Sequence, residues 1–124
     1  MIVKWFPSAK RDMQRLGIYC RDYFGLNVAV RVVSSVRQKV SVLGNYPDMG
    51  KSEPLLSHRR EEWRSLVVHE NTKVIYLVGE KSVNIAALWD TRRHPDRLDR
   101  YVDHLIETDP SVLNEPQLSY GIES

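Results

Sequence analysis

Residues 63–90 read WRSLVVHENTKVIYLVGEKSVNIAALWD, and this stretch carries the clearest structural signal in the chain. It contains runs of β-branched and aromatic residues with a period of two, which is typical of strands. The runs cover residues 63–69, 74–78 and 83–89, and short polar segments, 70–72 and 79–82, separate them. The sequence therefore predicts a three-stranded antiparallel meander.

Two amphipathic helices are predicted before the meander. Apolar residues recur at helical spacing over residues 9–24 and again over 29–43, with Gly25 after the first helix and Gly44 after the second. Asn27 is the expected N-cap of the second helix. A short strand over residues 2–6, which Pro7 ends, comes first. We therefore expect a strand followed by an αα-hairpin.

The rest of the chain is predicted from breaks in these patterns. Residues 45–62 read as a loop, because Pro47, Gly50 and Pro54 interrupt any period, and Pro95 begins a last helix that ends at Asp109. The fold class is α+β in the order β-α-α-β-β-β-α, a small antiparallel sheet with the αα-hairpin on one face and the other face open as a concave platform. We expect one domain, residues 1–109, and an acidic tail, residues 110–124.

Composition and cysteine content narrow the class of protein. A chain of 124 residues that is 42% hydrophobic suits one compact core. Its single cysteine, Cys20, cannot form an internal disulfide, and it lies on the apolar side of the first predicted helix, where we expect a core residue. Neither a signal peptide nor a membrane span is expected, so we predict a cytoplasmic protein without membrane contact.

The charges are unevenly distributed along the chain. Lys and Arg number 8 against 3 Asp and Glu in residues 1–50, 10 against 8 in residues 51–100, and 0 against 5 in residues 101–124. A basic body suits a phosphate backbone or an acidic protein partner. The acidic tail is expected either to fold back over that body or to keep the protein in solution.

The strongest candidate site is the segment Trp89-Asp90-Thr91-Arg92-Arg93-His94-Pro95, which follows the last predicted strand. At the rim of a sheet, the guanidinium groups of Arg92 and Arg93 can bind phosphate or carboxylate, and His94 can transfer protons near neutral pH. Other basic side chains could reach the same rim: His58, Arg59, Arg60, Arg64 and Lys73. The alternative is that all of them are exposed charges between secondary elements. No metal site and no cofactor is expected, because the histidines lack ligand spacing.

In these motifs and their order, the sequence resembles the RelE/ParE toxins of bacterial type II toxin-antitoxin modules, often called plasmid stabilisation proteins. The resemblance spans about residues 2–106 and rests on Trp5 with the 9–23 helix pattern, Pro47-Asp48-Met49-Gly50, and residues 64–68, 75–78 and 85–95. It implies the same fold and a growth-inhibiting toxin that a cognate antitoxin neutralises. A homodimer and a heterotetramer with the antitoxin both stay open.

Two mechanisms divide that family. ParE-like members inhibit DNA gyrase without chemistry of their own, whereas RelE-like members cut messenger RNA on the ribosome with basic side chains. Arg64, Lys73 and Arg92 match RelE positions, but Leu66 replaces another basic residue, and Leu98 stands where a tyrosine is expected, with Tyr101 about one turn later. His94 would have to substitute as acid or base.

The ending Asp-Thr-Arg-Arg-His-Pro is more similar to ParE sequences, so the resemblance favours a gyrase inhibitor. The residues expected to bind its target or a phosphate are Arg59, Arg60, Arg64, Arg92 and Arg93. One alternative is a metal-independent, ribosome-dependent mRNA endonuclease, an mRNA interferase that would use Arg64, Lys73, Arg92 and His94. A second alternative is a basic binding module with no toxic role.

Overall fold

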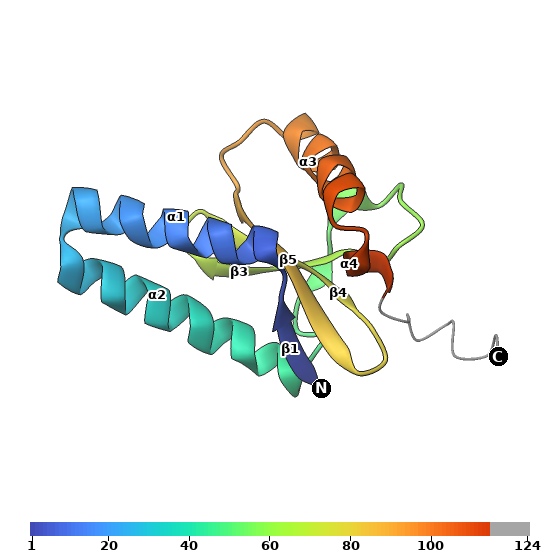
Figure 1. The fold of residues 1–124 in the computed structure, drawn as a ribbon, viewed down its shortest axis with the longest axis horizontal. Coiled ribbons are helices and arrows are strands. Elements are labelled where there is room, and N and C mark those ends of the chain that lie inside the picture. Colours follow the sequence, from blue (N-terminus) through green and yellow to red (C-terminus); the bar gives the residue numbers. More distant parts are fainter. Residues whose placement is uncertain (115–124) are drawn as a thin grey trace.

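The computed structural model describes residues 1–114, in which helices pack on both faces of a five-stranded sheet (Figure 1). The strands are β1 (Ile2–Trp5), β2 (Lys51–Ser52), β3 (Arg64–His69), β4 (Thr72–Val78) and β5 (Ser82–Asp90). The helices are α1 (Pro7–Phe24), α2 (Leu26–Ser41), α3 (Asp96–Thr108) and the short α4 (Ser111–Asn114). Two 3-10 turns are η1 (Val42–Gly44) and η2 (Pro54–Leu56).

The predicted meander is present, and β1 joins it from one side. Strands β3, β4 and β5 are consecutive antiparallel neighbours. Strand β1 pairs with β5 in parallel, with Val3 opposite Val83, and the two-residue β2 pairs with β3, so the order is β1-β5-β4-β3-β2. The expected antiparallel sheet is therefore corrected to a mixed sheet, with its one parallel pair at the β1 edge.

A β-bulge in β5 anchors the start of α1. The register between β4 and β5 shifts between Ile75 and Tyr76, which makes Ala86 an extra residue of β5. The carbonyl oxygen of Ala86 accepts a hydrogen bond of 2.6 Å from the hydroxyl of Ser8, a buried residue in the first turn of α1. The hydrogen bond to the bulge thereby fixes the position of the first turn of α1 against β5.

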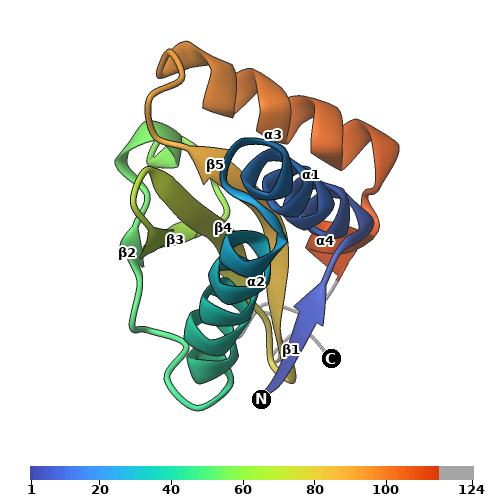
Figure 2. The same cartoon turned by 90° about the vertical axis from the view of Figure 1, so that its left-hand side faces the viewer.

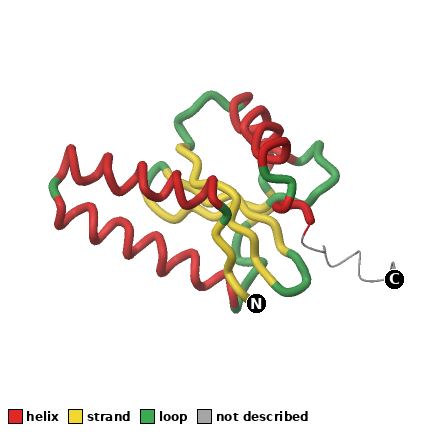
Figure 3. Tube along the Cα trace, in the orientation of Figure 1, coloured by secondary structure: helices red, strands yellow, loops and turns green. Residues whose placement is uncertain are grey.

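Helices α1 and α2 form the predicted αα-hairpin, which extends past the end of the sheet (Figures 1 and 3). Gly25 has a φ of 96°, a left-handed conformation that reverses the chain in one residue. Helix α2 therefore begins at Leu26, and its N-cap is Gly25 instead of the expected Asn27. The buried residues that the hairpin packs onto one face of the sheet are Ala9, Met13, Val36 and Val40.

Helix α3 covers the opposite face of the sheet, so the expectation of an open concave platform there is wrong. Leu98, Val102 and Leu105 of α3 are buried in a second core cluster, and Figure 2 shows α3 running across the top of the molecule, apart from α2. The strand residues of this cluster are Ile75, Leu77, Ala86, Ala87 and Trp89. Since β4 and β5 are buried on both faces, their sequences are nearly continuous apolar runs.

The predicted loop and tail contain short regular pieces. Strand β2 and turn η2 lie inside residues 45–62, and α3 begins at Asp96 with Pro95 as its N-cap. Of the predicted acidic tail, residues 110–124, the part after Asn114 lies outside the described residues, as does its expected contact with the basic body. Val112 of α4 is fully buried, and Cys20 is in the core as expected. No helix within residues 1–114 has both the length and the apolar character needed to cross a bilayer.

Candidate functional site

The basic residues expected to cut RNA together do not meet. Arg64 begins β3 directly opposite Tyr76, whose side chain belongs to the core cluster under the α1–α2 hairpin. Lys73 and Tyr76 are three residues apart in β4. Because successive side chains of a strand point to opposite faces, the side chain of Lys73 lies on the other face of the sheet. Arg92 lies beyond the end of β5. The sheet itself therefore separates Arg64 from Lys73.

Lys73 is engaged in a buried ion pair. Its ammonium group donates to a carboxylate oxygen of Glu53, which is 1% exposed and also accepts a hydrogen bond of 2.9 Å from the Leu55 amide. Burial acts to raise the pKa of the Glu53 carboxyl, but the bonds from Lys73 and Leu55 outweigh it, and the pKa is lowered. Lys73 thus holds η2 against the sheet.

Arg64 is held by acidic and carbonyl groups of the neighbouring loop. Its guanidinium donates to a Glu62 carboxylate oxygen at 3.1 Å and to the Asp48 carbonyl at 3.5 Å. The side chain is 17% exposed, and its buried Nε has no hydrogen-bond partner within residues 1–114. Arg64 is consequently a partly buried residue whose Nε donor is not satisfied by the described residues.

The motif Pro47-Asp48-Met49-Gly50 is clamped onto the sheet by Tyr76. The Tyr76 hydroxyl donates to the Pro47 carbonyl at 2.8 Å and accepts from the Gly50 amide at 3.0 Å. A Cβ atom at Gly50 would lie 2.5 Å from both the Ser65 carbonyl oxygen and the Tyr76 hydroxyl. Only glycine fits this close approach, so the motif is a structural feature of the fold.

Arg92 and His94 are exposed at the rim where the sequence predicts them. The Nε and Nη2 atoms of Arg92 donate to the two carboxylate oxygens of Asp90 at 3.0 and 2.9 Å, and this fork lowers the pKa of the Asp90 carboxyl. The side chain of Arg92 is still 67% exposed. The Nδ1 atom of His94 accepts from the Asp96 amide at 3.3 Å. Within residues 1–114, no group of three or more His, Cys, Asp or Glu side chains is placed to hold a metal ion.

A chain of side chains connects Arg93 to helix α1. The Arg93 guanidinium lies 4.7 Å from the centre of the Trp89 ring, which packs against Tyr101 at 5.3 Å. The Tyr101 hydroxyl donates to Asp12 of α1 at 3.4 Å. Burial and the charge of Asp12 raise the pKa of Tyr101 to about 12. Tyr101 is therefore a neutral link between α3 and α1, unsuited to proton transfer near neutral pH.

Arg59 connects the η2 segment to α3, whereas its neighbour Arg60 is exposed. The Nε of Arg59 donates to the Asp99 carboxylate at 2.8 Å, and its Nη2 donates to the Asp99 carbonyl at 2.9 Å and to Asp103. The Nε2 of His58 lies 3.0 Å from the same Asp99 carboxylate. With a side chain only 13% exposed, Arg59 is a structural residue.

Sequence reasoning missed a row of cations on α3. Arg97, Arg100 and His104 recur at i, i+3 and i+7, so they share one side of the helix, and this spacing was the available signal. They line a hollow of about 410 Å³ together with Trp89, Arg93 and Tyr101. A second hollow of about 260 Å³, which includes Arg15 and Arg92, shares the same Trp89, Arg93 and Tyr101.

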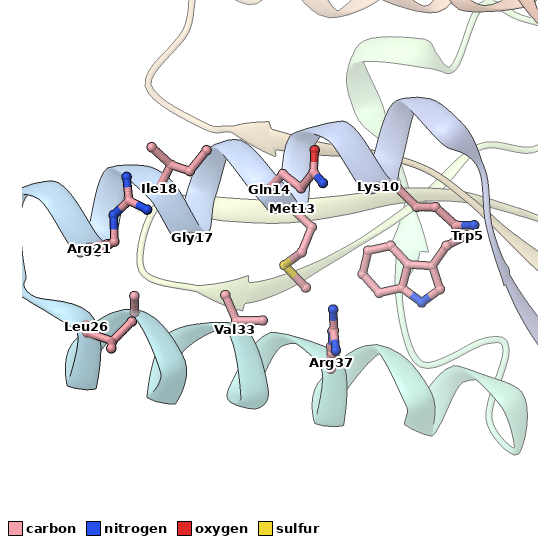
Figure 4. Close-up of a pocket in the computed structure, with 11 residues that line it drawn as sticks. Trp5, Lys10, Met13, Gln14, Gly17, Ile18, Arg21, Leu26, Val33 and Arg37 are labelled. Carbon is pink, nitrogen blue, oxygen red and sulfur yellow. The ribbon is translucent and has the colours of Figure 1, made fainter.

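A larger groove, of about 720 Å³, lies between α1 and α2 (Figure 4). Its charged lining residues are all cations: Lys10, Arg21 and Arg37. Its apolar lining residues are Trp5, Met13, Ile18, Leu26, Ala29 and Val33. The groove therefore has the chemistry to hold an apolar segment that carries acidic side chains.

The tip of the hairpin exposes a cluster of large apolar side chains. Tyr23 is 71% exposed, Leu26 65% and Phe24 61%, and the rings of Tyr19 and Tyr23 are in contact at 4.7 Å. Such clusters on a protein surface mark contact sites for other macromolecules. Leu26 belongs both to the tip and to the groove, so the two surfaces are continuous.

Comparisons with known proteins bear on this arrangement. The family model for the ParE toxin of the type II toxin-antitoxin system parDE matches residues 3–95. The solved structure described as the chromosomal ParDE TA system from P. aeruginosa is similar with a TM-score of 0.64 at 19% sequence identity. That similarity covers 74% of this chain and 97% of the other, and it concerns the fold. No curated protein matches the chain.

Proposed function

Since the chain belongs to the family of ParE toxins of type II toxin-antitoxin systems, we propose that it inhibits bacterial growth by blocking DNA gyrase, in the cytoplasm, until a cognate antitoxin neutralises it. The family membership supports a toxin. The choice of gyrase over messenger RNA rests on the chemistry that the described residues can perform.

The observation that carries this choice is that Arg64 and Lys73 lie on opposite faces of the sheet. Cleavage of RNA requires its acid, base and phosphate-binding groups within hydrogen-bond reach of one scissile bond. Lys73 is committed to Glu53, and Arg64 is partly buried beside the Pro47–Gly50 loop. Inhibition of an enzyme by binding needs no such group, so the gyrase proposal is consistent with the whole arrangement.

The proposed contact with gyrase is the tip of the hairpin. The hairpin extends past the end of the sheet, and its aromatic residues Tyr23 and Phe24 are more than half exposed (Figure 1). Aromatic residues contribute most of the binding free energy in many protein interfaces. The tip is therefore the part of the surface best suited to a protein target.

The proposed antitoxin site is the groove between α1 and α2. The three cations in its lining, with no acidic residue among the lining side chains, are complementary to an amphipathic segment that presents an apolar side and acidic residues. An antitoxin seated there would also cover Leu26, which belongs to the tip. Neutralisation would then follow from masking the gyrase contact.

The proposal is tested with purified protein in two parallel assays. We expect loss of supercoiling by gyrase and intact messenger RNA in primer extension on programmed ribosomes. The Tyr23→Ser variant should inhibit gyrase at least tenfold less, whereas the control Tyr46→Ser, an exposed tyrosine in the loop after α2, should inhibit normally. Cuts in the ribosomal A site that vanish in Arg92→Ala or His94→Ala would overturn the gyrase mechanism in favour of the endonuclease.

Two further measurements complete the test. Induced expression with confirmed protein in the soluble fraction should stop growth, and normal growth would favour the non-toxic binding module. The Arg37→Glu variant should bind the antitoxin at least tenfold more weakly than the control Arg31→Glu, whose arginine lies on α2 outside the groove lining. Equal affinities would show that the antitoxin binds elsewhere.

A further inference from the structure

The rim after β5 and one side of α3 together form a continuous basic surface. It consists of the two adjoining hollows, which share Trp89, Arg93 and Tyr101. Their lining includes five arginines against two aspartates, Asp12 and Asp90. We call this set the basic face: Arg15, Arg92, Arg93, Arg97, Arg100 and His104.

The arginines that α3 contributes to the basic face have no acidic partner within residues 1–114. Asp99 and Asp103 lie on another side of the helix, where Arg59 binds both of them. Within residues 1–114, neither Arg97 nor Arg100 forms an ion pair or a side-chain hydrogen bond. Asp99 and Asp103 are thus engaged by a different segment of the chain, while Asp96, the residue before Arg97, lies 3.7 Å from His94.

The two aspartates that line the hollows, Asp12 and Asp90, are also engaged. Asp12 has a side chain 14% exposed, and it accepts from the Leu88 amide at 3.1 Å and from Tyr101. Burial raises the pKa of its carboxyl. Asp90 is held by the fork of Arg92. The outward character of the surface is therefore cationic.

We propose that the basic face binds the phosphate backbone of duplex DNA. Guanidinium groups form forked hydrogen bonds with phosphate oxygens, and a row of them along one helix side can contact successive phosphates. Trp89 is only 3% exposed, and Arg93 covers its ring. The central aromatic ring is therefore unavailable to stack on bases, which favours a duplex over a single strand.

The α3 part of this face lies outside the match to the ParE family model. Arg97, Arg100 and His104 lie beyond residues 3–95, which the ParE family model matches. The inference extends the proposed function, because a toxin that binds gyrase through its hairpin could hold the DNA segment on which gyrase acts. DNA binding itself can be measured without gyrase, so the two proposals can fail separately.

The test is binding of a fluorescent 20-base-pair duplex by the full chain, followed by anisotropy over a series of salt concentrations. If all five arginines contact phosphates, log K should fall with log salt with a slope of about −4 to −5. The double variant Arg97→Ala/Arg100→Ala should bind roughly tenfold or more weakly, with a slope reduced by about two. Arg97→Lys/Arg100→Lys should keep most of the affinity.

The control loses the same two charges elsewhere, in Arg31→Ala/Lys81→Ala, and should bind DNA as the unmodified chain does. An equal loss in the control would overturn the proposal, because net charge alone would then explain binding. Tighter binding to the single strand, or to an RNA duplex of the same sequence, would also overturn it. DNA binding without gyrase inhibition would support this inference and overturn the proposed function. Gyrase inhibition without DNA binding would support the proposed function and overturn this inference.

Discussion

Lys73 donates a charge-assisted hydrogen bond to Glu53, across 20 residues of sequence and onto a carboxylate that is 1% exposed. The pair joins the start of β4 to the residue before η2. Because the carboxylate has little access to water, its charge depends on the ammonium group for compensation. A residue that resembles a catalytic lysine in the sequence therefore acts as a support for the fold.

Replacing Lys73 by methionine should lower the free energy of unfolding by about 3 kcal/mol, because it leaves a buried carboxylate without its cation. Urea denaturation followed by circular dichroism measures the change. The control Lys81→Met, at an exposed lysine between β4 and β5, should stay within about 0.5 kcal/mol of the unmodified chain. Equal stability of both variants would contradict the structural role of Lys73.

The same pair predicts a sensitivity to acid. The folded-state pKa of Glu53 lies below its ordinary value of 4.5, so its contribution to stability is complete above pH 4.5 and is lost as the pH falls through the folded-state pKa. The Glu53→Gln variant lacks this titration. Its deficit in unfolding free energy relative to the unmodified chain should therefore narrow below pH 4.5, and a constant deficit from pH 7 to pH 2.5 would contradict the assignment.

Asp12 should contribute a pH dependence of stability opposite to that of Glu53. Burial raises the folded-state pKa of its carboxyl above the ordinary value of 3.8, so ionisation at neutral pH works against folding. The Asp12→Asn variant should be slightly more stable than the unmodified chain at pH 7. That advantage should shrink as the pH falls through the folded-state pKa towards 3.8, and thermal unfolding at several pH values measures it. A variant less stable at pH 7 would show that the carboxylate charge is favourable.

Arg59 and Arg60 form a natural matched pair. Arg59→Ala should lower the free energy of unfolding by about 1.5 kcal/mol, since it removes the bonds to Asp99 and Asp103, which are themselves partly exposed. Arg60→Ala should have no measurable effect on stability. Neither variant should change DNA affinity by more than its loss of one charge. If the Arg59→Ala protein were as stable as the unmodified chain but bound phosphate more weakly, Arg59 would be a binding residue instead of a structural one.

Gly50 and Gly17 should respond oppositely to the same substitution. Gly50→Ala should cost about 2 kcal/mol, because the new methyl group meets the Ser65 carbonyl and the Tyr76 hydroxyl. Gly17→Ala lies in the middle of α1, where the nearest atom to a new Cβ is a Val33 methyl at 3.4 Å, and should gain about 0.5–1 kcal/mol. Differential scanning fluorimetry would detect both shifts, and a tolerated Gly50→Ala would contradict the loop clamp.

Local patterns predicted most of the fold. The meander and the hairpin follow from periods of two and of about four in the sequence, which need no knowledge of distant residues. The parallel pairing of β1 with β5 joins residues that are 80 apart, as in Val3 and Val83, and nothing local encodes it. The burial of β4 and β5 under α3 is similarly a property of the packed molecule.

The candidate site was predicted less well than the fold, because its side-chain partners also lie far apart in the sequence. Arg92 and Arg93 were correctly expected at the rim, because their position depends only on where β5 ends. Arg59 was expected to bind the target or a phosphate, and Lys73 to act in the alternative RNA cleavage, yet their acidic partners lie 40 and 20 residues away in sequence. A count of charges cannot reveal which of them are already paired.

The central position of β5 has a consequence for how the toxin is made. This strand pairs with both β1 and β4, and it supplies residues to both core clusters, although it is the last strand to be synthesised. During translation, α1 and α2 emerge long before the surface on which they pack. A chain that ends before β5 lacks the strand that joins β1 to β4 and part of both core clusters, so we expect only nearly complete translation to give a stable fold.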